Sequence, residues 1–341
     1  MRVAILGAGA MGTVLGAFMT KNGCKVDMID SYTEHVKALN EKGAKIIGFA
    51  DMTVPVSALT PCQMEGTYDL VFLFTKQTTN EEVLRNLIPH LNAASTVCTL
   101  QNGVPEVYVA EKVGGDRTVG GTVLWGATFI GPGVSELTQD ISRLAHLFEI
   151  GEIDGKISGR IKKVAEILGY MGPAEISSEL MDSRWTKLVA NACMSGMSAA
   201  CGCTFGEVLD NPKARACLCY IGNEVKKTCE ADGHKLHTLL NYDLTPLSFK
   251  KPEDFEVSQK MFINIYNGLR SAKASMLQDL ERGKKTEVNM LNGFVSDTAR
   301  KYGIATPFCD TVVKVITGIE SRHLPLSMDN LKYFKVPGFQ E

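Results

Sequence analysis

Apolar runs of strand length alternate with helical patterns in the first half of the chain. The strand-like runs are residues 2–6, 25–29, 69–75 and 95–100, and the segments with helical periodicity are 13–21 and 81–91. Strands that alternate with helices are typical of a parallel, doubly wound sheet. Further strand-like segments between 117 and 150, with a turn at 131–133, are expected to extend the same sheet.

The second half of the chain is predicted to be helical. A helix over 158–171 and a short strand over 174–177 place the domain boundary near residue 178. Beyond it we expect one long helix over 182–200, and later helices that include 269–280 and 286–303. The predicted fold class is α/β, with an N-terminal doubly wound domain (1–178) and an all-helical C-terminal domain (179–341).

A glycine-rich turn joins the first strand to the first helix. In the pattern G-x-G-x-x-G, the first glycine permits the tight turn, the second lets the backbone approach a pyrophosphate, and the third allows close helix–strand packing. The helix N-terminus adds unpaired N–H groups. This context predicts a Rossmann-type domain that binds NAD(P)H, with the cofactor held by Gly7, Ala8, Gly9, Ala10, Met11 and Gly12.

Asp30 ends the second strand. A carboxylate there can accept hydrogen bonds from the adenosine ribose hydroxyls and repels a 2′-phosphate. No Arg lies between Asp30 and His35, so the residues favour NADH over NADPH. The alternative is that Asp30 only caps the following helix near Thr33.

Two polar residues follow later strands of the same sheet. Lys76 comes after one strand, and Asn102 comes after the next in the run Gln101–Asn102–Gly103. Ligands bind beyond the carboxyl ends of such strands, so both residues are candidates for cofactor or substrate contact. The alternatives are a solvated lysine and an ordinary Asn-Gly turn.

The helical half carries a polar stripe. Lys187, Asn191 and Ser195 stand at successive i+4 positions and share one face of the predicted helix, among apolar or small neighbours. Such a stripe is either a solvent edge or the wall of a cleft, and the combination of Lys, Asn and Ser favours the cleft. Thr286 and Glu287 suit the start of a later helix, and capping alone would account for both.

Composition narrows the class of protein. The chain has 341 residues, 45% of them hydrophobic, with 36 Lys and Arg against 38 Asp and Glu. This balance gives no reason to expect nucleic acid or membrane as a partner. The first strand leaves no room for a signal peptide, so we expect a cytoplasmic protein in which the ten cysteines are buried thiols. The C-x-C spacings at 201–203 and 217–219 do not match zinc sites, and no metal is expected.

These motifs together resemble the ketopantoate reductase (2-dehydropantoate 2-reductase) family. The resemblance extends from residue 1 to about residue 320 and rests on the glycine turn, Lys76, Gln101–Asn102–Gly103, the W-x-K-x-x-x-N of 185–191 and the S-M-L-Q-D…K-T-E of 275–287. It implies that Lys187 donates the proton to the keto oxygen and that Glu287 lies beside it. It also implies that Asn102, Asn191 and Ser275 position substrate or nicotinamide, and that Lys76 contacts the cofactor.

Three positions differ from the usual family pattern. Asp30 stands where an Arg for NADPH is frequent, Ser195 stands where a second Asn is common, and Asn289 replaces an Asp. The first difference bears on cofactor preference, and the other two bear on substrate identity. The stretch 234–265 is longer than usual and could reshape the substrate entrance.

The sequence therefore predicts an enzyme that reduces a 2-keto acid with NAD(P)H, with ketopantoate as the leading substrate. Lys187 and Glu287 are the predicted catalytic residues, and Asn102, Asn191, Ser195 and Ser275 the predicted substrate-binding residues. The expected partners are the small-molecule 2-keto acid and a second copy of the chain in a homodimer. The alternatives are a sibling dehydrogenase for another 2-keto acid or an imine, and a non-catalytic dinucleotide sensor.

Overall fold

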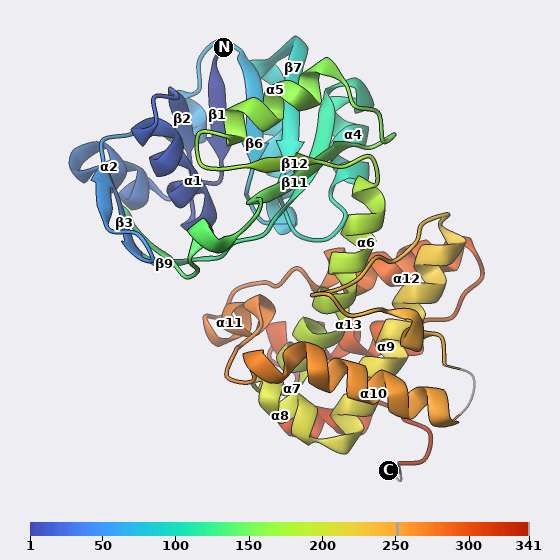
Figure 1. Ribbon diagram of the computed structural model, residues 1–341. Coiled ribbons are helices and arrows are strands. Elements are labelled where there is room, and N and C mark those ends of the chain that lie inside the picture. The colour runs from blue at the N-terminus through green and yellow to red at the C-terminus, as the bar shows by residue number, and fades with distance from the viewer. Residues whose placement is uncertain (250–251, 340–341) are drawn as a thin grey trace. The chain divides into compact units, whose positions relative to one another are not determined.

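The structure, a computed structural model, describes residues 1–249 and 252–339 (Figure 1). The chain forms two compact units, Met1–Leu180 and Met181–Glu341. The first unit is mixed α/β and the second is helical. The predicted fold class is therefore confirmed.

An eight-stranded sheet forms the centre of the first unit. The strand order is β12-β11-β8-β7-β6-β1-β2-β5, and only the pairing of β8 with β11 is antiparallel. The strands are β1 (Val3–Leu6), β2 (Val26–Ile29), β5 (Ser57–Leu59), β6 (Tyr68–Leu73), β7 (Leu91–Thr99), β8 (Thr118–Val123), β11 (Phe148–Glu152) and β12 (Ala174–Ile176). Because β1 pairs with both β2 and β6, the strand order reverses beside β1, which is where open parallel sheets bind ligands.

Helices cover both faces of this sheet. Alternate residues of β1 enter two separate cores, with Val3 and Ile5 in one and Ala4 and Leu6 in the other. The first core includes side chains of α1 (Ala10–Lys21), α2 (Thr33–Lys42) and α5 (Gly159–Leu168). The second includes side chains of α3 (Asn80–Leu87) and α4 (Glu106–Val113). Burial on both faces explains why the central strands read as continuous apolar runs.

The strands between 117 and 150 do not all extend the main sheet, as the sequence had suggested. β8 and β11 do, but β9 (Ala127–Gly131) and β10 (Val134–Leu137) join a separate four-stranded sheet with β3 (Ala44–Gly48) and β4 (Met52–Val54). Strands β3, β4 and β5 were not predicted, because runs of three to five residues are too short to show a clear period. The pairing of β10 with β3 joins residues about ninety positions apart, which local patterning does not reveal.

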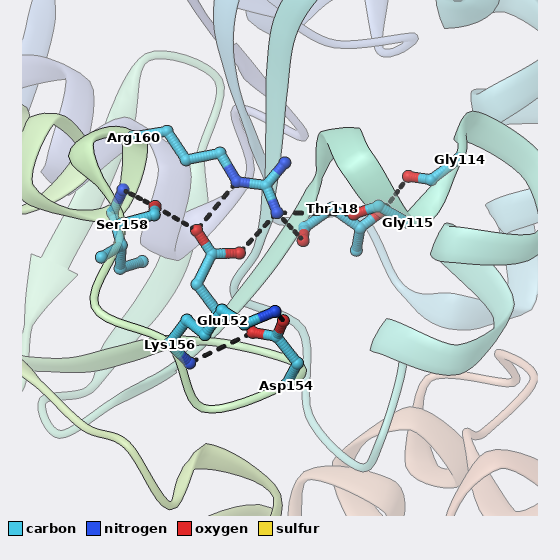
Figure 2. Close-up of polar contacts among 9 residues, drawn as sticks. Gly114, Gly115, Thr118, Glu152, Asp154, Lys156, Ser158 and Arg160 are labelled. Carbon is cyan, nitrogen blue, oxygen red and sulfur yellow. Dashed lines mark hydrogen bonds and ion pairs between the residues drawn. The ribbon is translucent and has the colours of Figure 1, made fainter.

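A partly buried ion pair connects elements near the β12 edge of the main sheet (Figure 2). Glu152, at the end of β11, accepts a hydrogen bond from Arg160 Nε at 2.8 Å and forms a second contact with the same guanidinium. Ser158 Oγ, which caps α5, donates to the same carboxylate. Arg160 also donates to the carbonyl oxygen of Thr118 at 3.4 Å. This network attaches α5 to β8 and β11 and lies away from the glycine turn.

The second unit consists of helices and short turns. The α-helices are α6 (Leu180–Ala190), α7 (Gly196–Cys201), α8 (Phe205–Asp210), α9 (Pro212–Ala231), α10 (Pro252–Tyr266), α11 (Ser275–Glu281), α12 (Asn292–Lys301) and α13 (Pro307–Glu320). The single helix predicted over 182–200 is interrupted by a π-helical turn, Asn191–Ser195. The helix predicted over 269–280 is shorter and begins at Ser275.

Three further features of the structure concern its helices, its cysteines and its possible metal ligands. Within the described parts of the chain, none of the helices combines the length and apolarity needed to cross a membrane. Nine of the ten cysteines are buried, and Cys62 is exposed. Among residues 1–249 and 252–339, no three His, Cys, Asp or Glu side chains are grouped so that they could hold a metal ion.

Candidate active site

The three glycines of the turn after β1 have three separate structural roles. Gly7 has a φ of +93°, and a Cβ on it would lie 2.6 Å from the backbone nitrogen of Thr75. A Cβ on Gly12 would lie 2.1 Å from the carbonyl oxygen of Gly7, so this glycine permits the close packing of α1. A Cβ on Gly9 would meet no atom within 4 Å. The space beside Gly9 is open, as backbone approach of a pyrophosphate requires.

The start of α1 completes this cradle. Gly9 is the N-cap residue, and α1 begins at Ala10, three residues earlier than the sequence suggested. The N–H groups of the first helical turn, which includes Met11, have no partner within the helix. Together with the helix dipole they favour an anion at this position. The turn therefore fits the diphosphate of a dinucleotide.

Asp30 lies beside this turn, directly after β2. Its N–H donates to the carbonyl oxygen of Leu59 at 3.1 Å, and its Oδ1 accepts the N–H of Tyr32 at 2.9 Å. Helix α2 begins at Thr33 with Tyr32 as N-cap and has no side-chain cap, so Asp30 shapes the turn before the helix without capping the helix. The carboxylate is half-buried. One of its oxygens is committed to the turn, and the other is the candidate acceptor for ribose hydroxyls.

Buried amide side chains join the ends of β6 and β7. Gln101 donates from Nε2 to the carbonyl oxygen of Thr75 and to Asn80 Oδ1, both at 2.6 Å. Gln77 donates to the carbonyl oxygen of Asn102 at 2.5 Å. Because Thr75 also lies against Gly7, these bonds bring the segments of the glycine turn, Lys76 and Asn102 to one edge of the sheet.

The sequence predicted Lys76 and Asn102 at this edge but missed the amides that position them. Lys76 is exposed and Asn102 is partly exposed, whereas Gln77, Asn80 and Gln101 are buried. The available signal was an unusual density of amide residues directly after two buried strands.

In the second unit, the polar stripe survives the interruption of its helix. Lys187, Asn191 and Ser195 are each partly exposed, whereas most of their neighbours in the helix are buried. These buried neighbours include Trp185 and Leu188, both with 0% exposure. The stripe is thus a narrow accessible line on an otherwise buried helix.

A residue far along the chain holds the π turn. Asn292 is fully buried and donates from Nδ2 to the carbonyl oxygen of Ala192 at 3.0 Å. A Cβ on Gly196 would lie 3.1 Å from Asn292 Oδ1, so a larger residue there would push the amide away by a few tenths of an ångström. Single π turns inside α-helices are frequent at functional sites. Asn292 was not among the residues predicted from the sequence.

The π turn places one buried donor without an acceptor. Asn191 Nδ2 is inaccessible to solvent and has no hydrogen-bond partner among the residues that the structure describes. An unsatisfied buried amide costs about 1–3 kcal/mol unless a ligand satisfies it. This donor is therefore a candidate contact for substrate.

Ser275 and Glu287 lie on other elements of the same unit. Ser275 is exposed at the first position of α11, which packs against the π turn and α7. Glu287 is 8% exposed and precedes a 3₁₀ turn, Val288–Met290. The helix expected to begin near Thr286 begins at Asn292, because the backbone breaks at Leu291 with φ −110° and ψ −87°.

Thr286 nevertheless fixes the backbone on which Glu287 sits. Its N–H and its hydroxyl both donate to Glu320 Oε1 at 2.7 Å, and its Oγ1 accepts the N–H of Val288 at 3.2 Å. The expected role of Thr286 as a helix N-cap is therefore wrong, because the 3₁₀ turn has Glu287 as its N-cap, without a side-chain cap. The result is a buried acid held on a segment that packs against α13.

A second buried acid lies in the core behind the π turn. Glu224 on α9 accepts the N–H groups of Phe308 and Cys309 at 2.8 Å, and so caps α13. Burial raises the pKa of Glu224 to about 7, against the two backbone donors, which lower it. Burial also raises the pKa of the thiols Cys193 and Cys309 well above the usual range. These groups act as core residues.

A parallel sheet with a glycine turn is typical of proteins that bind a dinucleotide, and here it is followed by a helical unit with an accessible stripe that contains a lysine. Comparison with known families specifies which kind. Residues 3–148 match the family model described as ketopantoate reductase PanE/ApbA, and residues 179–320 match the model of its C-terminal part. The chain belongs to the ketopantoate reductase family and is an enzyme of the oxidoreductase class.

Individual relatives span nearly the whole chain. The 2-dehydropantoate 2-reductase of Archaeoglobus fulgidus is 29% identical over 94% of this chain and 98% of its own length. That of Lactococcus lactis is also 29% identical, over 93% of this chain and 97% of its own length. Among solved structures, D-mandelate dehydrogenase with NADH and anilino(oxo)acetate has a TM-score of 0.79 and 26% identity, over 94% of this chain and 99% of the other.

Proposed function

We propose that the chain reduces a 2-keto acid with a nicotinamide dinucleotide, and that the substrate is ketopantoate, which becomes pantoate. The observation that carries this proposal is the accessible stripe of Lys187, Asn191 and Ser195 on a buried helix. The names of the matching reductases support the choice of ketopantoate. The donors of the glycine turn fit the cofactor.

The residues of the helical unit act on the substrate carbonyl. Reduction places negative charge on the keto oxygen, and the ammonium group of Lys187 stabilises that charge and then donates the proton. Glu287, a buried carboxylate, keeps this lysine charged and oriented or binds a substrate hydroxyl. Asn191 offers its buried N–H, and Ser195 and Ser275 offer hydroxyl groups that orient the substrate.

The residues of the first unit hold the cofactor, which supplies the hydride when bound. The glycine turn (Gly7 to Gly12) binds the diphosphate. Lys76 and Asn102 contact the cofactor near the ends of β6 and β7. Asp30 accepts hydrogen bonds from ribose hydroxyls and repels a 2′-phosphate, so the chain prefers NADH to NADPH.

A second candidate substrate is another 2-keto acid. The likeness to D-mandelate dehydrogenase, at 26% identity and over nearly the whole chain, favours this alternative. The departures at Ser195 and Asn289 lie in the unit that would contact the substrate. The cofactor chemistry would be the same in both cases.

A panel of 2-keto acids assayed with NADH and NADPH separates the two candidates. The proposal predicts that kcat/KM, measured from the loss of NADH absorbance, is highest with ketopantoate and NADH. A higher kcat/KM with an aromatic 2-keto acid would transfer the assignment to the sibling dehydrogenase. NADH binding without turnover of any 2-keto or imine substrate would show a dinucleotide sensor.

A further inference from the structure

A buried histidine contacts the glycine turn from the side of α2. His35 is 1% exposed, and its Nε2 lies 2.6 Å from the carbonyl oxygen of Ala8. Its Nδ1 accepts the N–H of Gly133, in the β9–β10 turn, at 2.9 Å. Since Nδ1 is an acceptor, the ring is neutral with its proton on Nε2, which donates to Ala8. Thr13 Oγ1 donates to the same carbonyl at 2.5 Å.

These two donors fix the direction of one peptide group. The peptide unit from Ala8 to Gly9 is planar and trans, so its C=O and N–H point in opposite directions. With the carbonyl of Ala8 held against His35 and Thr13, the N–H of Gly9 points away from them. The space beside Gly9 is open.

We propose that neutral His35 is a positioning residue that aims the N–H of Gly9 at the cofactor diphosphate. This inference rests on the proposed function for the identity of the cofactor. His35 does not itself contact the ligand, and it acts through the Ala8 carbonyl. It also connects the cofactor turn to the small sheet through Gly133.

The elements packed on the ring contribute Ala8, Thr13, Gly133 and the ring of Phe129.

The titratable and charged groups near His35 belong to its own helix or the turn before it. Glu34 and Lys37 are exposed neighbours on α2, and the Tyr32 ring lies 6.4 Å from the His35 ring. Asp30 is committed through Oδ1 to the N–H of Tyr32.

Two substitutions separate the contacts of His35. In His35→Asn, Oδ1 can still accept from Gly133, but no atom reaches the Ala8 carbonyl. We expect the Kd for NADH to rise about tenfold, with kcat at saturating NADH nearly unchanged. In His35→Gln, Nε2 can still donate to Ala8, and we expect a near-normal Kd for NADH.

Two further variants complete the test: one is a control for stability, and the other removes the second donor to Ala8. Ser95→Ala removes a buried hydroxyl on β7 that donates to the carbonyl of Tyr68, the first residue of β6, at 2.6 Å. We expect this variant to leave the Kd for NADH unchanged. Thr13→Val removes the other donor to Ala8 and should also weaken NADH binding. It keeps the test decisive if His35→Asn does not fold.

NADH titrations followed by fluorescence at neutral pH decide the matter. Wild-type affinity in His35→Asn or, if that variant does not fold, in Thr13→Val would overturn the assignment, as would a Kd for NADH in His35→Gln raised as much as in His35→Asn. Each of these results would leave the proposed function standing. A wild-type chain that bound neither NADH nor NADPH would overturn both.

Discussion

At the carboxyl edge of the main sheet, buried amides bond to one another and to the backbone, whereas around the π turn buried donors have no partner in the described structure. Gln77, Asn80 and Gln101 form the first arrangement. Asn191 Nδ2 and Trp185 Nε1 form the second. The candidate cofactor site of the first unit and the candidate substrate site of the second unit therefore differ in how far the protein alone completes their hydrogen bonding.

This difference suits two kinds of ligand. A dinucleotide presents the same diphosphate and ribose groups each time, and a rigid backbone cradle can be built for them in advance. A keto acid must be oriented at one reacting carbon, and donors that only the ligand satisfies contribute to that orientation. Under the proposed function, the unsatisfied amide of Asn191 lowers the stability of the ligand-free protein and strengthens substrate binding.

The largest effect should come from Lys187→Ala. Loss of the ammonium group should lower kcat by about 10²–10⁴, because the proposed mechanism assigns both the proton and the stabilising charge to this group. The Kd for NADH, measured by fluorescence, should not change, since the glycine turn is intact. Lys301→Ala, at the exposed end of α12, is the control and should leave kcat unchanged.

A pair of asparagine variants tests the comparison itself. Asn191→Ala removes a donor that has no partner in the described structure, so kcat/KM for the keto acid should fall about 10–100-fold without a fall in the Tm of the ligand-free protein. Asn292→Ala removes the hydrogen bond from Nδ2 to the Ala192 carbonyl and should lower the free energy of unfolding by about 1–3 kcal/mol. Equal loss of stability in both variants would contradict the distinction between them.

Asp30→Arg tests the candidate cofactor site of the first unit. Replacing the carboxylate with a guanidinium removes the repulsion of a 2′-phosphate and supplies a partner for it. The ratio of kcat/KM with NADH to that with NADPH should fall about tenfold or more. An unchanged ratio would show that Asp30 only shapes the turn at Tyr32.

The smallest effect should be a pH dependence of the folding stability of the helical unit. Because burial raises the pKa of Glu224 to about 7, the folded state binds a proton more tightly than the unfolded state. The associated stability is fully present below the unfolded pKa, about 4.3, and is lost as the pH rises to about 7. Glu224→Gln should flatten this dependence. Hydrogen exchange at Phe308 and Cys309, compared with amides of β1, would measure it.

Local patterns predicted the fold well where contacts are local. The unit from β1 through α1 to β2, with Asp30 after it, followed from the spacing of three glycines and two apolar runs. The placement of β9 and β10 was wrong, since it depends on pairing with distant β3. The π turn also escaped prediction, because its partner Asn292 lies 100 residues from Ala192.

Dependence on distant contacts also separates the site residues that were predicted from those that were missed. Lys76, Asn102 and Lys187 stand out by residue type and by their position after a strand or on a helix face. His35 gave no local signal, because its contact with Gly133 spans 98 residues. Gln101 lay inside a recognised motif, but its bonds to Thr75 and Asn80 depend on the tertiary fold.

The central claim is that an ammonium group at position 187 protonates the keto oxygen. It can be tested by restoring that group chemically. In a Cys62→Ser background, which removes the one exposed cysteine of the chain, Lys187→Cys should be nearly inactive. Alkylation with 2-bromoethylamine, which rebuilds an ammonium group at nearly the same distance, should recover most of kcat. Recovery by a neutral reagent of the same length, or none with the amine, would contradict the claim.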